Sequence, residues 1–389
     1  MAESRITQPV LFYFPGNMLL RNAGSQSRAR WFLEFLIENF DDVTVYSHFN
    51  NYAWPWTEGH VAQFAKEYPS VQLILETETR TTEYIKRSKN LLIPFFPSMS
   101  PKILNMNAPW KGQKLARYFS QKPDAVVFCS FVDGLTQLGN LHGRPYYIDT
   151  HDIKFSHHIK LRKKKASDLD VIRKFRGEVA LLNNAEGVIA ISPSEALIFH
   201  AILSNEKIYY VPLLPHAKSL NKGVYEYDIL FIGSSVQLNV EGICGFVERE
   251  SNWLHKYKIA LGGPLCATPE VRNLAERHSN ITLLGYVENL EDAYRLSKTT
   301  VSPLEGSGLK IKIVDSLAMN TPVFASRQSF DGLKPGYEDC VFPINRDIIE
   351  FILNDGGALA RAEDSARKYY EIWRKSGDEQ KLLERLRAA

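Results

Sequence analysis

Short apolar runs, rich in β-branched and aromatic residues, alternate along the chain with longer stretches in which polar and apolar residues mix at helical spacing. This alternation predicts strands separated by helices, as in parallel α/β sheets. The predicted strands of the first half are 9–14, 43–46, 72–75, 125–128, 145–148 and 187–191, with helices over 27–40 and 168–183. Those of the second half are 227–232, 257–261, 281–284, 299–302 and 322–325.

The two series of strands predict two domains. A chain of 389 residues is too long for one ordinary hydrophobic core, since domains commonly hold about 100–200 residues. Between the series, a strand-like run ends in prolines near residue 212, and a polar stretch continues through Lys222. We therefore predict an α/β protein with domains over 1–215 and 216–360, each built on a Rossmann-like sheet. Residues 361–389 are predicted to form a charged helical tail.

The composition is that of a globular protein, with 44% hydrophobic and 12% aromatic residues. No apolar run approaches the roughly 20 residues that span a bilayer, and residues 1–8 lack the basic-then-apolar pattern of a signal peptide. We therefore expect the protein to remain in the cytoplasm. The four cysteines are far apart and form no Cys-x-x-Cys pair, which argues against a zinc site and a disulfide framework.

Basic residues gather in one helix-like segment, at 160–165 and 173–176, although the net charge of the chain is only +3. The segment from Lys160 to Arg176 is either a solvated helix face or a surface that contacts anionic lipid or a polyanionic acceptor. In the second interpretation the protein is peripheral to the inner membrane. Nucleic acid is not an expected partner, because no nucleic-acid-binding module surrounds these charges.

A glycine-rich turn followed by a lysine-bearing helix start lies within residues 302–326. Gly306 and Gly308 allow the backbone to approach a ligand closely, and the free N–H groups of the following helix attract phosphate. Lys310 and Lys312 add full positive charges at the same end, and Asp315, farther along the helix, is suited to hydrogen-bond a ribose hydroxyl. The segment therefore predicts a binding site for a nucleotide diphosphate.

This segment resembles the donor-binding signature of the retaining GT-B glycosyltransferases, in particular family four. The resemblance rests on Pro-Leu, the run Gly-Ser-Gly-Leu-Lys-Ile-Lys, an acidic residue and Ala-Met-Asn-Thr-Pro-Val, and on earlier segments in the same order. Those segments are Asp228-Ile-Leu-Phe-Ile-Gly-Ser234 with Asn239-Val-Glu-Gly242, Leu261-Gly-Gly-Pro264, and Asn280-Ile-Thr-Leu-Leu-Gly-Tyr-Val-Glu288. The resemblance implies that two Rossmann-like domains face a cleft and that the C-terminal helix, here 361–389, crosses back to the first domain.

The resemblance also implies which residues of the second domain hold a nucleotide diphosphate sugar. Lys310 is expected to be catalytic, because it stabilises the diphosphate leaving group. The other expected donor-binding residues are Gly233, Ser234, Tyr286, Val287, Glu305, Ser307, Gly308, Leu309, Lys312 and Asp315. Within this set, the backbone at Tyr286 and Val287 is expected to hold the base.

The chain departs from the family pattern at two points. Many members carry an arginine just after the strand that ends near Gly233, whereas residues 233–248 contain neither Arg nor Lys, so charge neutralisation falls on Lys310 and Lys312. Many members also carry a pair of glutamates. Here Ser307 occupies the first position and an aspartate the second, with Glu305 as a candidate replacement for the first. The identity of the donor sugar therefore stays open.

In the first domain the resemblance points to two turns. Gly24, in the turn Ala23-Gly-Ser25 after the first strand, is expected to approach the donor phosphates. His151, in Ile148-Asp-Thr-His-Asp152, is expected to contact the donor sugar near its anomeric carbon, with Asp152 or Asp149 orienting it. His151 and Asp152 are therefore predicted to be catalytic residues.

Further acidic positions are interpreted as structural. Asp168-Leu-Asp170 has the spacing of an Asp-x-Asp metal motif but lies in the basic helical segment, and Glu195 follows a Ser-Pro-Ser helix start as a capping residue. No other spacing of His, Cys or acidic residues suggests a metal. We therefore expect a metal-independent reaction without a cofactor, in which positive charge and helix amides stabilise the departing diphosphate.

The most specific hypothesis is a retaining hexosyltransferase that moves a sugar from a nucleotide diphosphate sugar to a glycan or lipid-linked acceptor. The resemblance implies a role in cell-envelope or exopolysaccharide assembly. Alternatives on the same scaffold are an epimerase or phosphorylase, and a non-catalytic nucleotide-sugar-binding protein. The displaced glutamate and the missing arginine suggest the last of these.

Overall fold

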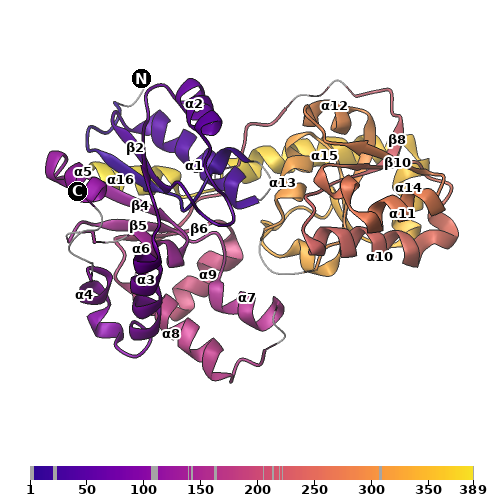
Figure 1. The fold of residues 1–389 in the computed structure, drawn as a ribbon. Helices are drawn as coiled ribbons and strands as arrows, with labels where there is room; N and C mark the ends of the chain where they lie inside the picture. Colours follow the sequence, from indigo (N-terminus) through magenta and orange to yellow (C-terminus); the bar gives the residue numbers. More distant parts are fainter. Residues whose placement is uncertain are drawn as a thin grey trace. The chain divides into compact units, whose positions relative to one another are not determined.

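The computed structural model describes residues 4–20, 24–106, 113–138, 140–141, 143–161, 164–204, 206–212, 214–218, 220, 222–305 and 309–388. The chain divides into two compact units (Figure 1). Unit 1 comprises Met1–Leu213 and Gly377–Ala389, and unit 2 comprises Leu214–Ser376. The chain therefore leaves unit 1 once and returns to it for the C-terminal residues.

Unit 1 is built on a parallel sheet whose seven described strands lie in the order β3-β2-β1-β4-β5-β6-β7. The strands are β1 Val10–Tyr13, β2 Val43–His48, β3 Gln72–Glu76, β4 Val126–Ser130, β5 Tyr146–Asp149, β6 Gly187–Ala190 and β7 Ile208–Tyr210. The helices are α1 Gly24–Asn39, α2 Glu58–Glu67, α3 Arg80–Leu92, α4 Ser100–Leu104, α5 Gln113–Gln121, α6 Val132–Leu138, α7 Lys154–Leu161, α8 Leu169–Asn183, α9 Pro193–Ile202 and α16 Glu379–Arg387, with 3-10 turns η1 Met18–Leu20 and η2 Pro97–Met99.

The core of unit 1 explains why the C-terminal helix belongs to it. Alternate residues of β1, Val10 and Phe12, pack in one buried cluster with the apolar face of α1. Leu382, Leu383 and Leu386 of α16 are buried in the same cluster. Asp378, just before α16, fixes this position, because its backbone N–H donates to Tyr210 O at 2.6 Å and its carboxylate accepts from Tyr210 N at 3.0 Å.

Unit 2 repeats the same topology with six described strands in the order β10-β9-β8-β11-β12-β13, again all parallel. This is the strand order of a Rossmann sheet. The strands are β8 Tyr227–Ile232, β9 Ile259–Gly262, β10 Ile281–Gly285, β11 Ser297–Ser302, β12 Val323–Ala325 and β13 Val341–Pro343. The helices are α10 Gln237–Leu254, α11 Pro269–Arg277, α12 Leu290–Arg295, α13 Ile311–Ala318, α14 Arg346–Asn354 and α15 Gly356–Arg374, with 3-10 turns η3 Pro264–Ala267 and η4 Arg327–Phe330.

The structure places the boundaries differently from the sequence prediction at two points. The predicted tail 361–389 contains parts of two helices, and only α16 lies in unit 1. Helix α15 stays in unit 2, because Ala358, Leu359 and Ala362 are buried in that unit's core. Strand β13 was not predicted, since it is short and ends in a proline.

The described residues also answer the questions of membrane spans and disulfides. None of the helices in the described part of the chain is both long and apolar enough to cross a bilayer. The cysteines are free thiols: Cys129, Cys266 and Cys340 are buried, and Cys244 is half-buried. The prediction of no disulfide framework is consistent with these positions.

Candidate functional site

Glycines lie close together at the carboxyl ends of β8, β9 and β10 in unit 2. Gly233 N donates to Gly262 O at 2.9 Å, and Gly263 N donates to Gly285 O at 2.7 Å. Gly263 has φ +97°, and a Cβ atom there would collide with the carbonyl of Gly233. The turns after β8 and β9 can therefore approach each other this closely only because residue 263 has no side chain. Ligands of open α/β sheets bind at this edge.

Two helices of unit 2 begin near the same edge with free amides. Helix α10 starts shortly after Gly233 and Ser234, and α13 starts at Ile311 with Lys310 as its N-cap residue. No side chain among the described residues caps either helix by a hydrogen bond. Uncapped N-terminal N–H groups, together with the helix dipole, favour an anionic ligand.

Lys312 and Gly233 both lie near the aromatic ring of Phe231. The Lys312 Nζ atom lies 5.4 Å from the centroid of this ring, and a Cβ atom on Gly233 would lie 3.0 Å from ring atom Cε1. Burial lowers the pKa of Lys312 to about 8, with Asp315 opposing this shift. Burial raises the pKa of Asp315 to about 7, with Lys312 opposing. The charged form of Lys312 would therefore be stabilised by an anion bound beside it.

The loop before α13 is anchored on both sides of its undescribed part. The Leu304 carbonyl accepts hydrogen bonds from the hydroxyls of Ser326, at 2.5 Å, and Ser329, at 3.2 Å. On the other side, Gly332 has φ +93°, and a Cβ atom there would lie 3.0 Å from Leu309 Cα. Glu305 is exposed, and the predicted residues Ser307 and Gly308 lie outside the described residues.

The remaining predicted residues of unit 2 lie at the same edge. Ser234 accepts from the Asn239 side-chain amide at Oγ, at 2.9 Å, so α10 is tied to the turn. Val287, after β10, contributes to a small buried cluster with Leu230 and Met319, and Tyr286 is 73% exposed. Asn320 takes the left-handed conformation, with φ +51°, immediately after α13 and its C-cap.

In unit 1, His151 is held by a buried ion pair that joins distant parts of the chain. Arg28 of α1 donates to Asp149 at 2.8 Å and to the carbonyls of Val211 and Pro212 at 2.8 and 2.5 Å. Asp149 Oδ2 lies 2.9 Å from His151 Nε2. Burial would raise the pKa of Asp149, but Arg28 and His151 outweigh it and hold that pKa well below its usual range.

The His151 turn has an unusual backbone. His151 and Phe131 both have positive φ, +57° and +66°, and their rings stack with centroids 4.2 Å apart. Such conformations cost free energy in residues other than glycine and gather at functional sites. Of the two aspartates that the sequence offered as partners, Asp149 lies beside His151, whereas Asp152 accepts the Ile153 N–H at 2.8 Å.

The other predicted positions of unit 1 have local roles. Gly24 is the first residue of α1. Glu195 accepts the Ile191 N–H at 3.2 Å, while Ser192 Oγ accepts the Glu195 N–H at the start of α9, in agreement with the capping interpretation. Asp168 is the N-cap residue of α8, and Asp170 pairs with Arg173 at 3.0 Å, which supports their structural interpretation.

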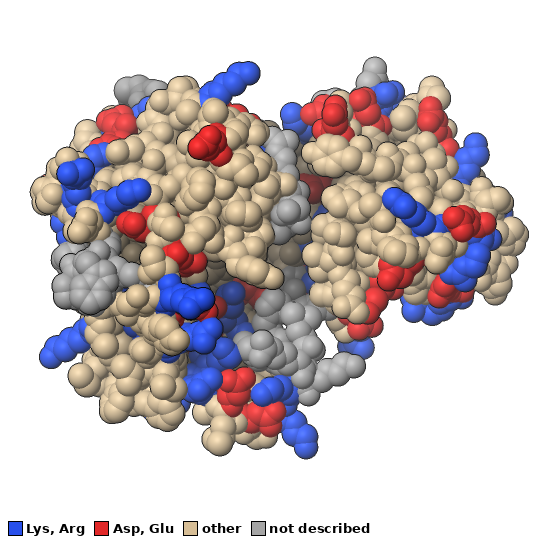
Figure 2. Space-filling view, viewed as in Figure 1, with Lys and Arg blue, Asp and Glu red and all other residues tan. Residues whose placement is uncertain are grey.

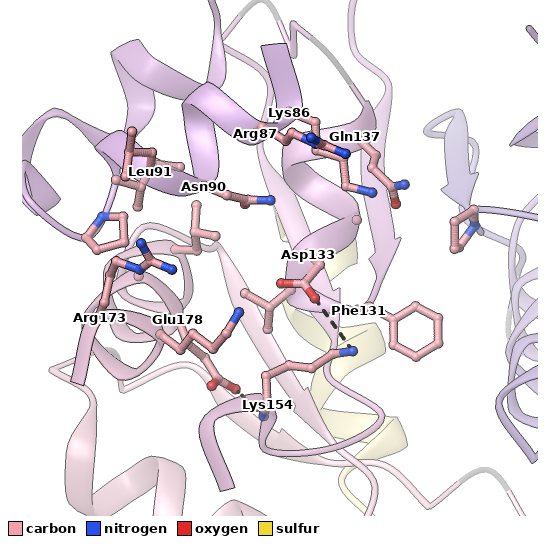
Figure 3. Close-up of a pocket in the computed structure, with 18 of the residues that line it drawn as sticks. Lys86, Arg87, Asn90, Leu91, Phe131, Asp133, Gln137, Lys154, Arg173 and Glu178 are labelled. Atoms are coloured by element: carbon pink, nitrogen blue, oxygen red, sulfur yellow. Dashed lines mark hydrogen bonds and ion pairs between the residues drawn. The ribbon is translucent and has the colours of Figure 1, made fainter. Parts of the chain in front are cut away.

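Unit 1 also contains a cavity of about 640 Å³ that the sequence did not predict. Its wall includes the basic residues Lys86, Arg87, Lys154, Arg173 and Lys174 and the acidic residues Asp133 and Glu178 (Figure 3). Figure 2 shows Lys and Arg side chains gathered on the part of unit 1 where Figure 1 draws α3 and α8. Phe131 lines this cavity as well as stacking on His151. In the sequence, the basic segment 160–176 indicated part of this cavity. Residues 86–87 did not, because only the fold brings α3 and α8 to the same cavity.

The part of the chain that the structure describes contains no group of three or more His, Cys, Asp or Glu side chains arranged to hold a metal. The metal-independent reaction stays a prediction.

Solved structures with the same architecture are glycosyltransferases of the GT-B type. HepE from Anabaena, in complex with UDP, has a TM-score of 0.64 at 13% identity, covering 98% of this chain and 100% of that chain. Sucrose-phosphate synthase from Thermosynechococcus elongatus has a TM-score of 0.63 at 15% identity, covering 94% of each chain. TarM has a TM-score of 0.63 at 12% identity, covering 98% and 99%. At these identities the likeness establishes the fold, which is GT-B, as predicted.

Unit 2 also matches a protein-family model. Residues 226–353 match the model of the family described as glycosyl transferases group 1, which covers the glycine-rich edge, Lys312 and Asp315. The match lies within unit 2, so unit 2 is similar to members of this family, and the whole chain shares the GT-B fold. No curated protein matches the chain by sequence.

Proposed function

We propose that the protein transfers a sugar, with retention of configuration, from a nucleotide diphosphate sugar to a glycan or lipid-linked acceptor. The observation that carries this proposal is the edge of the unit 2 sheet where two uncapped helix starts, Gly233 and Lys312 come together. This arrangement fits a diphosphate, which needs close backbone approach and positive charge.

The predicted charged residues and His151 have distinct roles in the proposed reaction. Lys310, Lys312 and the amides of α10 and α13 stabilise the diphosphate as the bond between it and the sugar breaks and its oxygen keeps the electron pair. The acceptor hydroxyl attacks the anomeric carbon from the same face, and its proton passes to the departing diphosphate. His151 contacts the sugar, Asp149 and Asp152 hold its turn, and Asp315 binds the ribose. No metal or cofactor is part of this proposal.

Named neighbours support the substrate classes. Two of them, HepE and TarM, were solved with UDP, and another, WaaG, is described as a glycosyltransferase involved in lipopolysaccharide biosynthesis, with a TM-score of 0.56. We therefore propose UDP as the first nucleotide to test and place the reaction in cell-envelope or exopolysaccharide assembly.

Calorimetric titration with UDP tests the donor site. We expect Lys312→Gln to weaken UDP binding about 10- to 100-fold, because hydrogen bonds to charged groups contribute about 1.5–3 kcal/mol. Lys310→Ala should lower the transfer rate. Lys258→Gln, an exposed lysine of the same unit, is the matched control and should bind UDP normally.

The outcome also separates the alternatives. UDP affinity that is unchanged in Lys312→Gln would contradict the proposed site. If a nucleotide sugar is converted to its epimer without an acceptor, the protein is an epimerase. Tight nucleotide binding without diphosphate release under a panel of acceptors would indicate a non-catalytic binding protein.

A further inference from the structure

The cavity of unit 1 carries an excess of positive charge that the protein itself does not neutralise. Among the residues that the structure describes, neither Lys86 of α3 nor Lys174 of α8 forms an ion pair with a carboxylate. Arg87 and Arg173 pair with acids of their own helices, Glu83 and Asp170. The cavity therefore presents two half-buried ammonium groups from two different helices.

The acids of the cavity wall do not offset these charges. Asp133 is 62% exposed and lies 3.7 Å from the ammonium group of Lys154. One Glu178 oxygen accepts the backbone N–H of Lys154 at 2.9 Å (Figure 3). The other accepts the backbone N–H of Phe155, also at 2.9 Å. Burial also raises the pKa of Glu178 to about 7, so this group is partly neutral near physiological pH. An anion in the cavity therefore meets little repulsion.

Exposed apolar side chains follow the cavity-lining residues in the sequence. Leu91 and Pro94 line the cavity, and the next residues along the chain, Phe95 and Phe96, are 58% and 51% exposed. Met99 in η2 is 47% exposed. Large exposed apolar side chains in sequence beside a polar pocket are typical of a surface that meets another apolar molecule.

The cavity also adjoins the predicted catalytic histidine. Phe131 lines the cavity and stacks on His151, and the Lys154 ammonium lies 4.9 Å from the centroid of the same ring. A molecule bound in the cavity is thus one aromatic ring away from His151. Given the role proposed for His151 in contacting the donor sugar, this position suits an acceptor.

We propose that the cavity binds a phosphate group of an amphiphilic acceptor, with Lys86 and Lys174 holding the phosphate and the acceptor's hydrocarbon chain lying on Phe95, Phe96 and Met99. This inference rests on the proposed function and specifies its acceptor as an anionic lipid-linked molecule. The two lysines supply charge from two different helices, α3 and α8, and the exposed apolar residues lie within the segment that follows α3. Charge and apolar surface together favour an amphiphilic anion over a neutral glycan.

Calorimetry on the full chain tests this inference with three probes: decyl phosphate below its micelle concentration, inorganic phosphate, and decyl maltoside. We expect decyl phosphate to bind at least tenfold more tightly than either of the others, since it alone supplies both features. Lys86→Gln with Lys174→Gln should weaken decyl phosphate binding at least tenfold, whereas Lys86→Arg with Lys174→Arg should retain it. Lys66→Gln, an exposed lysine of α2, is the control.

The apolar part is tested separately. Phe95→Ser with Phe96→Ser should reduce the affinity for decyl phosphate to that for inorganic phosphate and leave the latter unchanged. Equal binding of decyl phosphate and decyl maltoside, or full binding by the double Gln variant, would overturn the proposal. Equal binding of decyl phosphate and inorganic phosphate would overturn the lipid-linked acceptor.

The donor site provides an independent readout in the same protein. Lys312→Gln should weaken UDP binding without changing decyl phosphate binding. Lys312 belongs to unit 2, whereas Lys86 and Lys174 belong to unit 1. If only UDP fails to bind as expected, the proposed function is contradicted. If only decyl phosphate fails to bind as expected, this inference is contradicted.

Discussion

Glu195 illustrates how burial sets the chemistry of single residues in this protein. Its carboxyl group is buried beside the His151 turn, and one of its oxygens, Oε1, has no hydrogen-bond partner among the described residues. Burial, reinforced by Asp152, raises its pKa from 4.5 to about 8. The sequence suggested a capping role but gave no sign of this shift, because the shift depends on what covers the side chain.

This shift predicts a pH dependence of stability. Because the folded state holds the Glu195 proton more tightly than the unfolded state, the free energy of unfolding should fall as pH rises from about 4.5 to about 8. The slope contributed by this group is at most about 1.4 kcal/mol per pH unit. Urea unfolding of the wild type and Glu195→Gln at pH 5, 6.5 and 8 measures it. Relative to the variant, the wild type should lose stability with pH, and Glu38→Gln, an exposed control, should follow the wild type.

Other residues show the same limit of prediction. The motif located Gly233, Lys312 and Asp315 at one edge of a sheet, because glycine turns and helix starts have local signatures. The sequence left Asp149 and Asp152 as alternative partners of His151. Only the fold could decide between them, since Arg28 is 121 positions away from Asp149 in the chain.

At the scale of the elements, apolar runs predicted the strands well because parallel strands are buried and therefore continuously apolar. The start of helix α13 depends on a contact that the sequence pattern does not show. The helix begins at Ile311 rather than directly after the glycines, and Leu309 is held against Gly332, a contact between segments that no local pattern encodes.

Gly332 should therefore be needed to position the donor loop. Gly332→Ala places a side chain 3.0 Å from Leu309 Cα at a φ of +93°, which costs about 1–2 kcal/mol and displaces the loop. We expect UDP affinity to fall severalfold. Gly245→Ala is the matched control, because a Cβ atom at that helical position meets nothing within 4 Å. It should stabilise unit 2 by about 0.5–1 kcal/mol and bind UDP normally. An unaltered UDP affinity in Gly332→Ala would contradict the role of this contact.

For the whole molecule, the sequence predicted two domains and a return of the chain to the first. It misplaced the point of return, because helical spacing does not tell on which sheet a helix packs. The α15 and α16 helices have similar charged compositions, yet their apolar residues are buried in different cores.

Because each unit has its own core, calorimetry should resolve two thermal transitions. Leu382→Ala should lower only the unit 1 transition, since removing a buried Leu side chain costs about 2–5 kcal/mol. UDP at 100 times its Kd should stabilise only unit 2, by about 2.7 kcal/mol. Leu197→Ala, a 71% exposed position in α9, is the control and should change neither transition. If calorimetry shows a single transition, and both Leu382→Ala and UDP shift it as a whole, the two units do not unfold independently.

The return of the chain to unit 1 has a consequence for biosynthesis. The leucines of α16 complete a core whose other residues all precede unit 2 in the chain. While the ribosome is still producing Leu214–Ser376, the first sheet lacks this cover and exposes apolar surface. Unit 2 can finish folding before unit 1 does, so premature termination anywhere before Gly377 leaves the larger unit as a target for chaperones and proteases.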